Sequence, residues 1–248
     1  MIRKPGESPP ERETLYRVRF NPEEQDRKDC VWKVLCEQFF QRYVSPDAHV
    51  LDLAAGFGEF LNHIRASEKT AIDLNPETAS HLAPKIRFLN RSAESLEEVE
   101  SGSVDVVFAS NFLEHLPDRE ALSRVLREAF RVLCPGGRLM ILQPNIRLVG
   151  GAYWDFIDHR IPLTERSCSE LLESLGFTIE KIIPRFLPYT TKSPVPQSPF
   201  LVRLYLSFPP AWRLLGKQSF IVAAKPRVCS VESDSEFSTA RTQADRNV

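Results

Sequence analysis

Short apolar runs alternate with amphipathic stretches along most of the chain. The amphipathic stretches include 57–66, 76–82, 118–133 and 165–175, where apolar residues recur at helical spacing. Strands that alternate with helices indicate parallel β-α units, and runs as apolar as these indicate strands covered on both faces. The runs that we predict to be strands are, in order, HVLDLAA, KTAID, KIRFL, VDVVFAS, GRLMILQ, FTIEKII and SFIVAAK. Pro135-Gly136-Gly137 is expected to end the long helix before the fifth of them.

The regions outside this alternation differ in composition. Residues 16–44 carry apolar side chains at helical spacing, which predicts a helix before the first strand. Residues 1–15 and 226–248 are polar and predict disordered tails, so that one domain spans 16–225. The segment 184–217 has seven prolines and many apolar residues, and we expect a cap packed over the sheet. An alternative is a lipid-facing surface, with 197–216 as the candidate for peripheral membrane contact.

Charge and composition exclude several classes of protein. The sequence has 32 basic and 33 acidic residues, a formal net charge of −1, which argues against a protein that binds nucleic acid through many phosphates. No apolar run approaches the roughly 18 residues of a membrane-spanning helix, and the first residues lack the apolar core of a secretory signal. We therefore expect a cytoplasmic location. The five cysteines show no C-x-x-C spacing, and no metal site is predicted.

The segment VLDLAAGFGEF, residues 50–60, contains the most informative chemistry. A predicted strand runs into a predicted helix through a turn with Gly56 and Gly58, where small residues let a ligand approach the backbone and the N–H groups of the helix start. Asp73 ends the second strand fifteen residues after Gly58, where a carboxylate can accept hydrogen bonds from two ribose hydroxyls. The pattern predicts a nucleoside site at the carboxyl edge of a parallel sheet.

Two residues after this turn indicate which nucleoside it binds. A dinucleotide-binding fold has a third glycine where the helix crosses the strand, and Leu61 stands there in this chain. Glu59 is also expected to repel a pyrophosphate. A cationic ligand without phosphate fits better, and S-adenosylmethionine, a sulfonium with a ribose and an adenine, is such a ligand.

On these residues the chain resembles the class I S-adenosylmethionine-dependent methyltransferases. The resemblance covers about residues 45–185 and rests on four segments in the family's order: VLDLAAGFGEF, AIDLNP, VDVVFASNFLEHL and LREAFRVLCPGGRLMILQPN. It implies S-adenosyl-L-methionine as the cofactor. It also implies an α/β, Rossmann-like, doubly wound sheet of seven strands, with an N-terminal helical arm, a cap inserted before the last strand, and that strand antiparallel beside the fifth.

The resemblance also implies which residues contact the cofactor. Asp52 would orient the first loop and the cofactor's ammonium group, Asp73 would hold the ribose, and Asn111 would face the transferred methyl group. The acidic residue that the family often has at the adenine is replaced by Ser92, which leaves the Ala93 N–H or Glu94 for that role. The full implied set is Asp52, Ala54, Ala55, Gly56, Gly58, Asp73, Leu74, Ser92, Ala93, Glu94 and Asn111.

Methyl transfer to oxygen needs a group that takes the acceptor's proton. His159 in DFIDHR and His115 in LEHL are the candidate bases, and Asp158 is placed to position an acceptor. The segment 145–160, NIRLVGGAYWDFIDHR, follows the fifth strand. Its aromatic residues predict either an acceptor pocket with a lid or a cluster that closes the core.

These observations lead to one functional hypothesis with two alternatives. The hypothesis is methyl transfer from S-adenosylmethionine to a small-molecule or glycan-type acceptor, with oxygen favoured over nitrogen or carbon. A protein that binds the cofactor only to sense it or to support a partner is one alternative, and the polar residues on the acceptor side argue against it. A nicotinamide-dependent oxidoreductase is the other, disfavoured by Leu61 and Glu59. The acceptor and the oligomeric state are left open.

Overall fold

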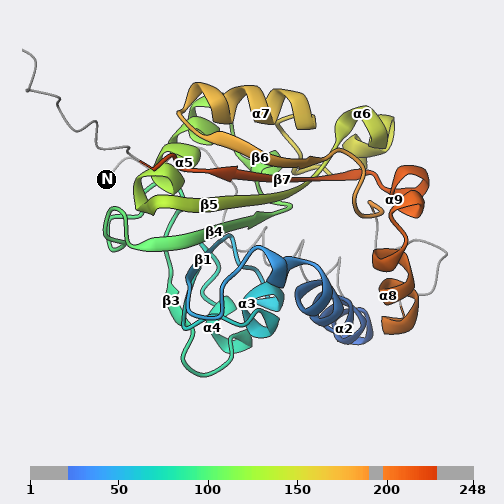
Figure 1. Ribbon diagram of the computed structural model, residues 1–248, viewed down its shortest axis with the longest axis horizontal. Helices are drawn as coiled ribbons and strands as arrows, with labels where there is room; N and C mark the ends of the chain where they lie inside the picture. The colour runs from blue at the N-terminus through green and yellow to red at the C-terminus, as the bar shows by residue number, and fades with distance from the viewer. Residues whose placement is uncertain (1–21, 190–197, 228–248) are drawn as a thin grey trace, which may run out of the picture.

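The computed structural model describes residues 22–189 and 198–227 (Figure 1). Seven strands form one sheet in the order β3-β2-β1-β4-β5-β7-β6. Strand β7 runs antiparallel to both β5 and β6, and the other pairs are parallel. The expected seven-stranded sheet with its last strand antiparallel beside the fifth is confirmed. The strands are β1 (His49–Leu53), β2 (Glu68–Ile72), β3 (Arg87–Leu89), β4 (Val104–Ser110), β5 (Leu133–Pro144), β6 (Thr178–Ile183) and β7 (Gln218–Ala224).

Helices cover both faces of this sheet. The tail expected over 1–15 lies outside the described residues, as does all but the start of the one expected over 226–248. The described α-helices are α2 (Pro22–Gln38), α3 (Glu59–His63), α4 (Thr78–His81), α5 (Arg119–Val132), α6 (Ile146–Val149), α7 (Glu165–Ser174), α8 (Pro199–Ser207) and α9 (Pro209–Leu215). Single 3-10 turns are η1 (Phe40–Arg42), η2 (Leu113–His115) and η3 (Gly150–Asp155).

The buried apolar residues form two clusters, one on each face of the sheet. Leu51 and Leu139 point to the face covered by α5 and α7, whereas their neighbours Val50 and Met140 point to the face covered by α2 and α3. Successive residues of a strand face opposite sides, so strands covered on both faces must be apolar at every position. This alternation explains why the apolar runs predict the strands well.

The start of β5 differs from the sequence expectation. The helix α5 ends at Val132, within one residue of the expected stretch 118–133, but β5 begins at Leu133, so that Pro135-Gly136-Gly137 lies inside the strand. Lys225, the residue after β7, closes the end of α5, because its Nζ donates hydrogen bonds to the carbonyls of Phe130 and Leu133 at 2.8 and 2.7 Å. An ammonium group at the C-terminus of a helix satisfies carbonyls that have no partner within it.

The described part of the cap packs at one end of the sheet, beside α2 (Figure 1). Phe186 and Leu206 are buried in the second apolar cluster, and the Tyr205 hydroxyl donates to the Phe186 carbonyl. Other apolar side chains of α8 and α9 face outward, and Phe200 and Leu214 are 71% and 80% exposed. Among the described residues, no helix combines the length and the apolar character that crossing a membrane requires.

Candidate functional site

Four loops meet at the carboxyl edge of the sheet. The loops that follow β1, β2, β4 and β5 begin at residues 54, 73, 111 and 145. From β1, the chain adds β2 and then β3 on one side of the sheet. It then crosses to the other side of β1, where it adds β4 and then β5, so the strand order reverses between β1 and β4. Ligands of open α/β sheets bind outside the carboxyl ends of the strands at such a switch point.

The loop after β1 has the open backbone that the sequence predicts. Gly56 has φ +57°, and a Cβ added to it would have no atom of the described residues within 4 Å. Gly58 has φ +72°, and a Cβ there would lie 2.5 Å from Leu82 Cδ2. The two glycines therefore have different roles: Gly58 allows close packing, whereas Gly56 leaves the loop surface accessible. Ala54 also has positive φ, at +56°.

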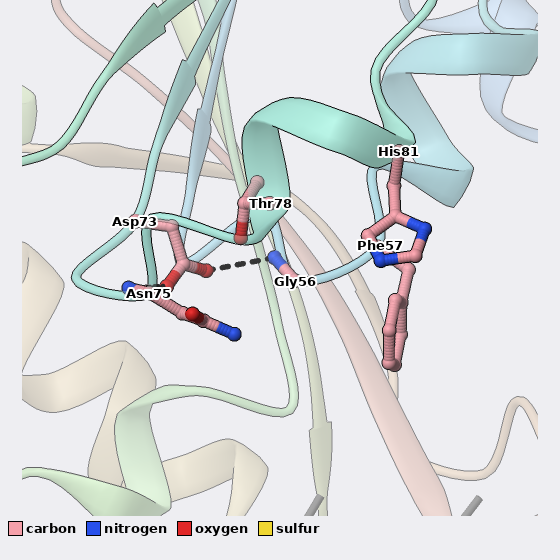
Figure 2. A pocket seen from close by; sticks show the side chains of 6 residues that line it. All are labelled: Gly56, Phe57, Asp73, Asn75, Thr78 and His81. Atoms are coloured by element: carbon pink, nitrogen blue, oxygen red, sulfur yellow. Dashed lines mark hydrogen bonds between the residues drawn. The ribbon is translucent and has the colours of Figure 1, made fainter. Parts of the chain in front are cut away.

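Asp73 joins the first two loops, as Figure 2 shows. Its Oδ2 accepts a hydrogen bond from the Gly56 N–H at 2.8 Å, and its Oδ1 accepts one from the Asn75 N–H at 2.8 Å. The carboxylate thus lies directly against the glycine loop, where the sequence analysis expects the ribose. A small pocket in this corner is lined by Gly56, Phe57, Asp73, Asn75, Thr78 and His81.

Acidic side chains surround the base of the same loop. Asp52 is 4% exposed, and burial raises its pKa well above the ordinary value, with further contributions from the charges of Glu59 and Asp73. A cation at this site would stabilise the ionised form of Asp52. Glu59 Oε1 forms an ion pair with Lys28 Nζ at 2.8 Å. Its charge is therefore balanced within the protein, and its expected repulsion of a pyrophosphate carries less weight than the fully buried Leu61.

The other residues of the expected cofactor set lie on the same edge with mixed surroundings. Leu74 is exposed beside Asp73, while Ala55 and Ala93 are buried. The Ser92 hydroxyl accepts a hydrogen bond from the Glu94 N–H at 3.2 Å. The Glu94 carboxylate is already paired with Arg124 at 2.8 Å, which leaves the backbone of 92–94 as the better candidate for an adenine contact.

Asn111 lies where β4 leaves the sheet, and its backbone has φ +47°. Its N–H donates to the Leu142 carbonyl at 2.8 Å, and its side-chain amide donates to Ser110 Oγ at 3.2 Å. Strained backbone of this kind is often found at functional sites. Asn111 is therefore fixed at the edge between the cofactor loop and the acceptor side.

The three candidate catalytic residues come together on the acceptor side. His115 Nδ1 lies 3.3 Å from Asp158 Oδ2 and 3.2 Å from the Asp158 carbonyl oxygen. The His115 and His159 ring centroids are 4.9 Å apart. Backbone bonds hold the two segments together, because the Glu114 carbonyl accepts from the N–H groups of Arg160 and Ile161 at 2.8 and 3.1 Å.

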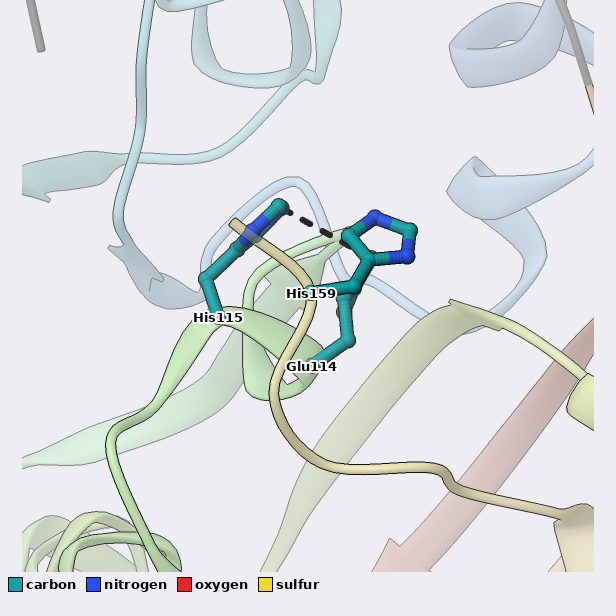
Figure 3. A group of neighbouring side chains, drawn as sticks. All are labelled: Glu114, His115 and His159. Carbon is teal, nitrogen blue, oxygen red and sulfur yellow. Dashed lines mark ion pairs between the residues drawn. The ribbon is translucent and has the colours of Figure 1, made fainter. Parts of the chain in front are cut away.

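Glu114 is a member of this group that the sequence analysis missed (Figure 3). Its side chain is buried, and burial raises its pKa above the usual range. Its Oε1 lies 4.0 Å from His115 Nε2. The available signal was a carboxylate immediately before His115 in the segment LEHL, but sequence alone does not show that its side chain turns inward.

Aromatic residues of the 145–160 segment surround His159. Its ring lies 4.6 Å from Tyr153 and 5.1 Å from Phe156, measured between centroids. Tyr153 is fully buried and its hydroxyl donates to the Ile161 carbonyl, whereas Trp154 is half exposed. The aromatic residues of this segment therefore pack as the cluster that closes the core, and the acceptor pocket with a lid stays a prediction.

Comparison with known proteins agrees with this geometry. Residues 51–141 match the family model described as "Methyltransferase domain". Sarcosine/dimethylglycine N-methyltransferase of Halorhodospira halochloris is 32% identical over 118 residues, which are 42% of this chain and 40% of that protein. Ubiquinone biosynthesis O-methyltransferase of Xanthomonas oryzae pv. oryzae is 34% identical over 108 residues, which are 40% of this chain and 44% of that protein. The matched segments thus span less than half of either relative.

A third relative and two solved structures extend the comparison. The ubiquinone/menaquinone C-methyltransferase UbiE of Bartonella quintana is 31% identical over 56% of this chain and 60% of its own length. A SAM-dependent methyltransferase from Archaeoglobus fulgidus has a TM-score of 0.61 at 20% identity, covering 86% of this chain and 99% of that one. The cyclase SpnF has a TM-score of 0.56 at 20% identity, with 80% and 81% covered. The structures share the fold.

Proposed function

We propose that this chain, a class I S-adenosylmethionine-dependent methyltransferase by its fold and by the family match of residues 51–141, transfers a methyl group to a hydroxyl of a small-molecule or glycan-type acceptor. The observation that carries the proposal is the open loop at Gly56, held by Asp73 and surrounded by acidic side chains at the switch point of the sheet. That surface suits a ligand with a ribose and positive charge.

The residues present fit S-adenosylmethionine. When bound, the cofactor supplies a methyl group that its sulfonium charge already makes electrophilic. Asp73 would accept hydrogen bonds from the ribose hydroxyls, and Asp52 would hold the ammonium group. The accessible backbone at Gly56 would lie against the methionine part, and residues 92–94 against the adenine. Leu74 would cover the ribose from its exposed position, and Asn111 would face the methyl group.

Oxygen is the acceptor atom that the site favours. The relatives transfer methyl groups to oxygen, nitrogen and carbon acceptors by their names, so they leave this choice open. A hydroxyl is a poor nucleophile until it loses its proton, and the group of His115, Asp158 and His159 offers proton-accepting atoms at the edge where the acceptor would enter. A protein that only sensed the cofactor would have no need of this group.

Isothermal titration calorimetry on the full chain tests the cofactor. We expect S-adenosylmethionine and its demethylated product to bind with similar stoichiometry, and NAD to bind far more weakly, because the loop has no glycine at Leu61 for a pyrophosphate. Tighter binding of NAD than of either compound would overturn the assignment. Binding of both compounds with no transfer in any assay would instead favour the sensor.

The acceptor can be found by labelled methyl transfer. Purified protein and S-adenosylmethionine carrying a labelled methyl group would be added to a fractionated cell extract, and labelled products identified by mass. We expect label on an oxygen of a small molecule or glycan. Label on nitrogen or carbon would retain methyl transfer and refute the choice of oxygen.

We also propose that the outward faces of α8 and α9 rest on an anionic membrane surface. Phe200, Leu204 and Leu214 are exposed there, and residues 198–217 contain three basic and no acidic residues. Apolar side chains beside basic ones are typical of helices that lie in the lipid interface. A location in the cytoplasm, against the inner face of the membrane, fits this proposal.

Vesicle flotation tests the membrane contact. The protein should float with vesicles that contain anionic phospholipid and less with vesicles of neutral phospholipid alone. Replacing Phe200 and Leu204 by serine should abolish flotation while cofactor binding stays unchanged. Serine at Ile157, which is 83% exposed and lies outside α8 and α9, is the matched control. Equal flotation of all variants would refute the contact.

A further inference from the structure

The group on the acceptor side contains the ligands of a metal site. Glu114, His115 and His159 each offer a donor atom, and these atoms all lie within 4.8 Å of one another (Figure 3). We propose that they bind a divalent transition-metal ion, and that the ion holds the oxygen of the acceptor. The second part of this inference rests on the proposed methyl transfer to oxygen, whereas the metal site itself does not.

Glu114 is a buried carboxylate with one oxygen that lacks a hydrogen-bond partner among the described residues. The residue is 1% exposed, and that oxygen is Oε2. Buried carboxylates are costly unless they are paired or coordinate a metal. His115 Nε2 lies 4.0 Å from Glu114 Oε1, which is too far for a hydrogen bond. An ion between the two side chains would satisfy both.

His115 is oriented as metal-binding histidines are. Asp158 lies at its Nδ1, with the carboxylate oxygen at 3.3 Å and the carbonyl oxygen at 3.2 Å. An Nδ1–H that donates to either oxygen leaves Nε2, the atom nearer Glu114, with its lone pair toward the centre of the group. Histidine ligands of metals characteristically donate their other ring N–H to a carboxylate or carbonyl, which fixes the ring and its tautomer.

His159 is brought to the same point by the main chain. The two residues after it donate their N–H groups to the Glu114 carbonyl, so that the strand-like segment 159–161 lies against η2. Tyr153 and Phe156 pack on its ring and restrict its rotation. The three donors thus come from segments more than 40 residues apart in the sequence, with their backbones locked together.

The donor set indicates the kind of ion. Two imidazoles and one carboxylate are the ligands of catalytic zinc sites and suit Mn²⁺, Fe²⁺ and Co²⁺ as well, whereas Mg²⁺ and Ca²⁺ prefer oxygen alone. Bonds of about 2.1 Å in tetrahedral directions would place the donors about 3.4 Å apart, so small side-chain rotations complete the site. Three protein ligands leave a coordination position for an oxygen of the acceptor.

The ion would change how the acceptor's proton is handled. A hydroxyl bound to a divalent cation has a lower pKa and loses its proton to solvent or to a nearby carboxylate. The histidines then act as ligands, and Asp158 becomes a positioning residue. Cysteine spacing gives no sign of this site, because the group contains no cysteine.

Metal titration of the untagged, chelator-treated chain is the direct test. We expect one equivalent of Co²⁺ to bind and produce visible absorption bands, and Zn²⁺ to displace it. Glu114→Gln and His159→Ala should each lower the affinity at least about 100-fold, and Asp158→Asn about 10–100-fold. His63→Ala, a histidine that pairs with Asp29 far from this group, is the control and should bind Co²⁺ normally.

Calorimetry with S-adenosylmethionine on the same samples separates the two proposals. Cofactor binding that persists without any Co²⁺ or Zn²⁺ binding in the wild-type chain would overturn the metal site and leave the proposed function in place. Metal binding without cofactor binding would overturn the proposed function and leave the metal site in place. If a variant does not fold, as judged by circular dichroism, the wild-type titration alone still decides whether the site exists.

Discussion

Replacing Asp52 by asparagine tests the electrostatics of the cofactor loop. The carboxyl is 4% exposed, and burial together with the charges of Glu59 and Asp73 raises its pKa well above 3.8. Asparagine has nearly the same shape and no charge. The substitution therefore removes the ionisation of this one group and leaves the packing of β1 in place.

The raised pKa makes a definite prediction about stability and pH. Between pH 3.8 and the raised pKa, the native chain keeps a proton on Asp52 that the unfolded chain releases. The stability that this proton contributes is present below pH 3.8 and is lost as the pH rises through the folded-state pKa. The loss is at most about 1.4 kcal/mol per pH unit. Asp52→Asn should lack this loss and be more stable than the wild type at neutral pH.

The same substitution should weaken cofactor binding. A hydrogen bond to a charged group contributes about 1.5–3 kcal/mol, so that Asp52→Asn should lower the affinity for S-adenosylmethionine by about 10- to 150-fold. The demethylated product keeps the ammonium group and should show the same loss. Wild-type affinity should also rise with pH as Asp52 ionises, and this dependence should disappear in the variant.

Urea unfolding and calorimetry from below pH 3.8 up to neutral pH measure both effects. Asp47→Asn is the control, because Asp47 is an exposed aspartate before β1, at the opposite edge of the sheet. If the free energies of unfolding of Asp52→Asn and the wild type change with pH in the same way, Asp52 has the same pKa in the folded and the unfolded chain. The electrostatic reasoning would then be wrong. A more stable variant with unchanged affinity would remove Asp52 from the ammonium site only.

Three further predictions concern the loop and the sheet. Asp73→Ala should weaken S-adenosylmethionine binding by about 1.5–3 kcal/mol in calorimetry, and unchanged affinity would remove Asp73 from the site. Gly56→Ala should lose about 1–2 kcal/mol in urea unfolding because of its positive φ, and Gly58→Ala should lose more, because its Cβ would also lie 2.5 Å from Leu82 Cδ2. Only Gly56→Ala should also bind the cofactor less tightly. Lys225→Met should lose about 1–3 kcal/mol of stability at neutral pH with cofactor binding unchanged, since its Nζ closes the end of α5.

The sheet could be predicted from the sequence because its physical cause is local. Strands buried on both faces need apolar residues at every position, and each apolar run contains nearly the residues of one strand. The cofactor loop could be predicted for the same reason, since Gly56 and Asp73 follow directly after two of these runs. The lysine contact at the end of α5 could not, because Lys225 is more than 90 residues away in the sequence.

The acceptor side shows the same limit more sharply. His115 and His159 could each be selected as candidates, but their contact depends on backbone hydrogen bonds between the Glu114 carbonyl and the N–H groups of residues 160 and 161. Sequence patterns report which residue types are present and not which main-chain groups pair. The inward turn of Glu114 follows from that pairing, which is why the buried carboxylate was missed.

Both halves of the carboxyl edge share one electrostatic feature. Asp52 on the cofactor side and Glu114 beside His115 are buried carboxylates, and burial raises the pKa of each. A cationic cofactor at one and a metal ion at the other would each bring the compensating charge. Because a ligand that binds only the native chain stabilises it by mass action, binding of the two proposed ligands would raise the stability of this edge.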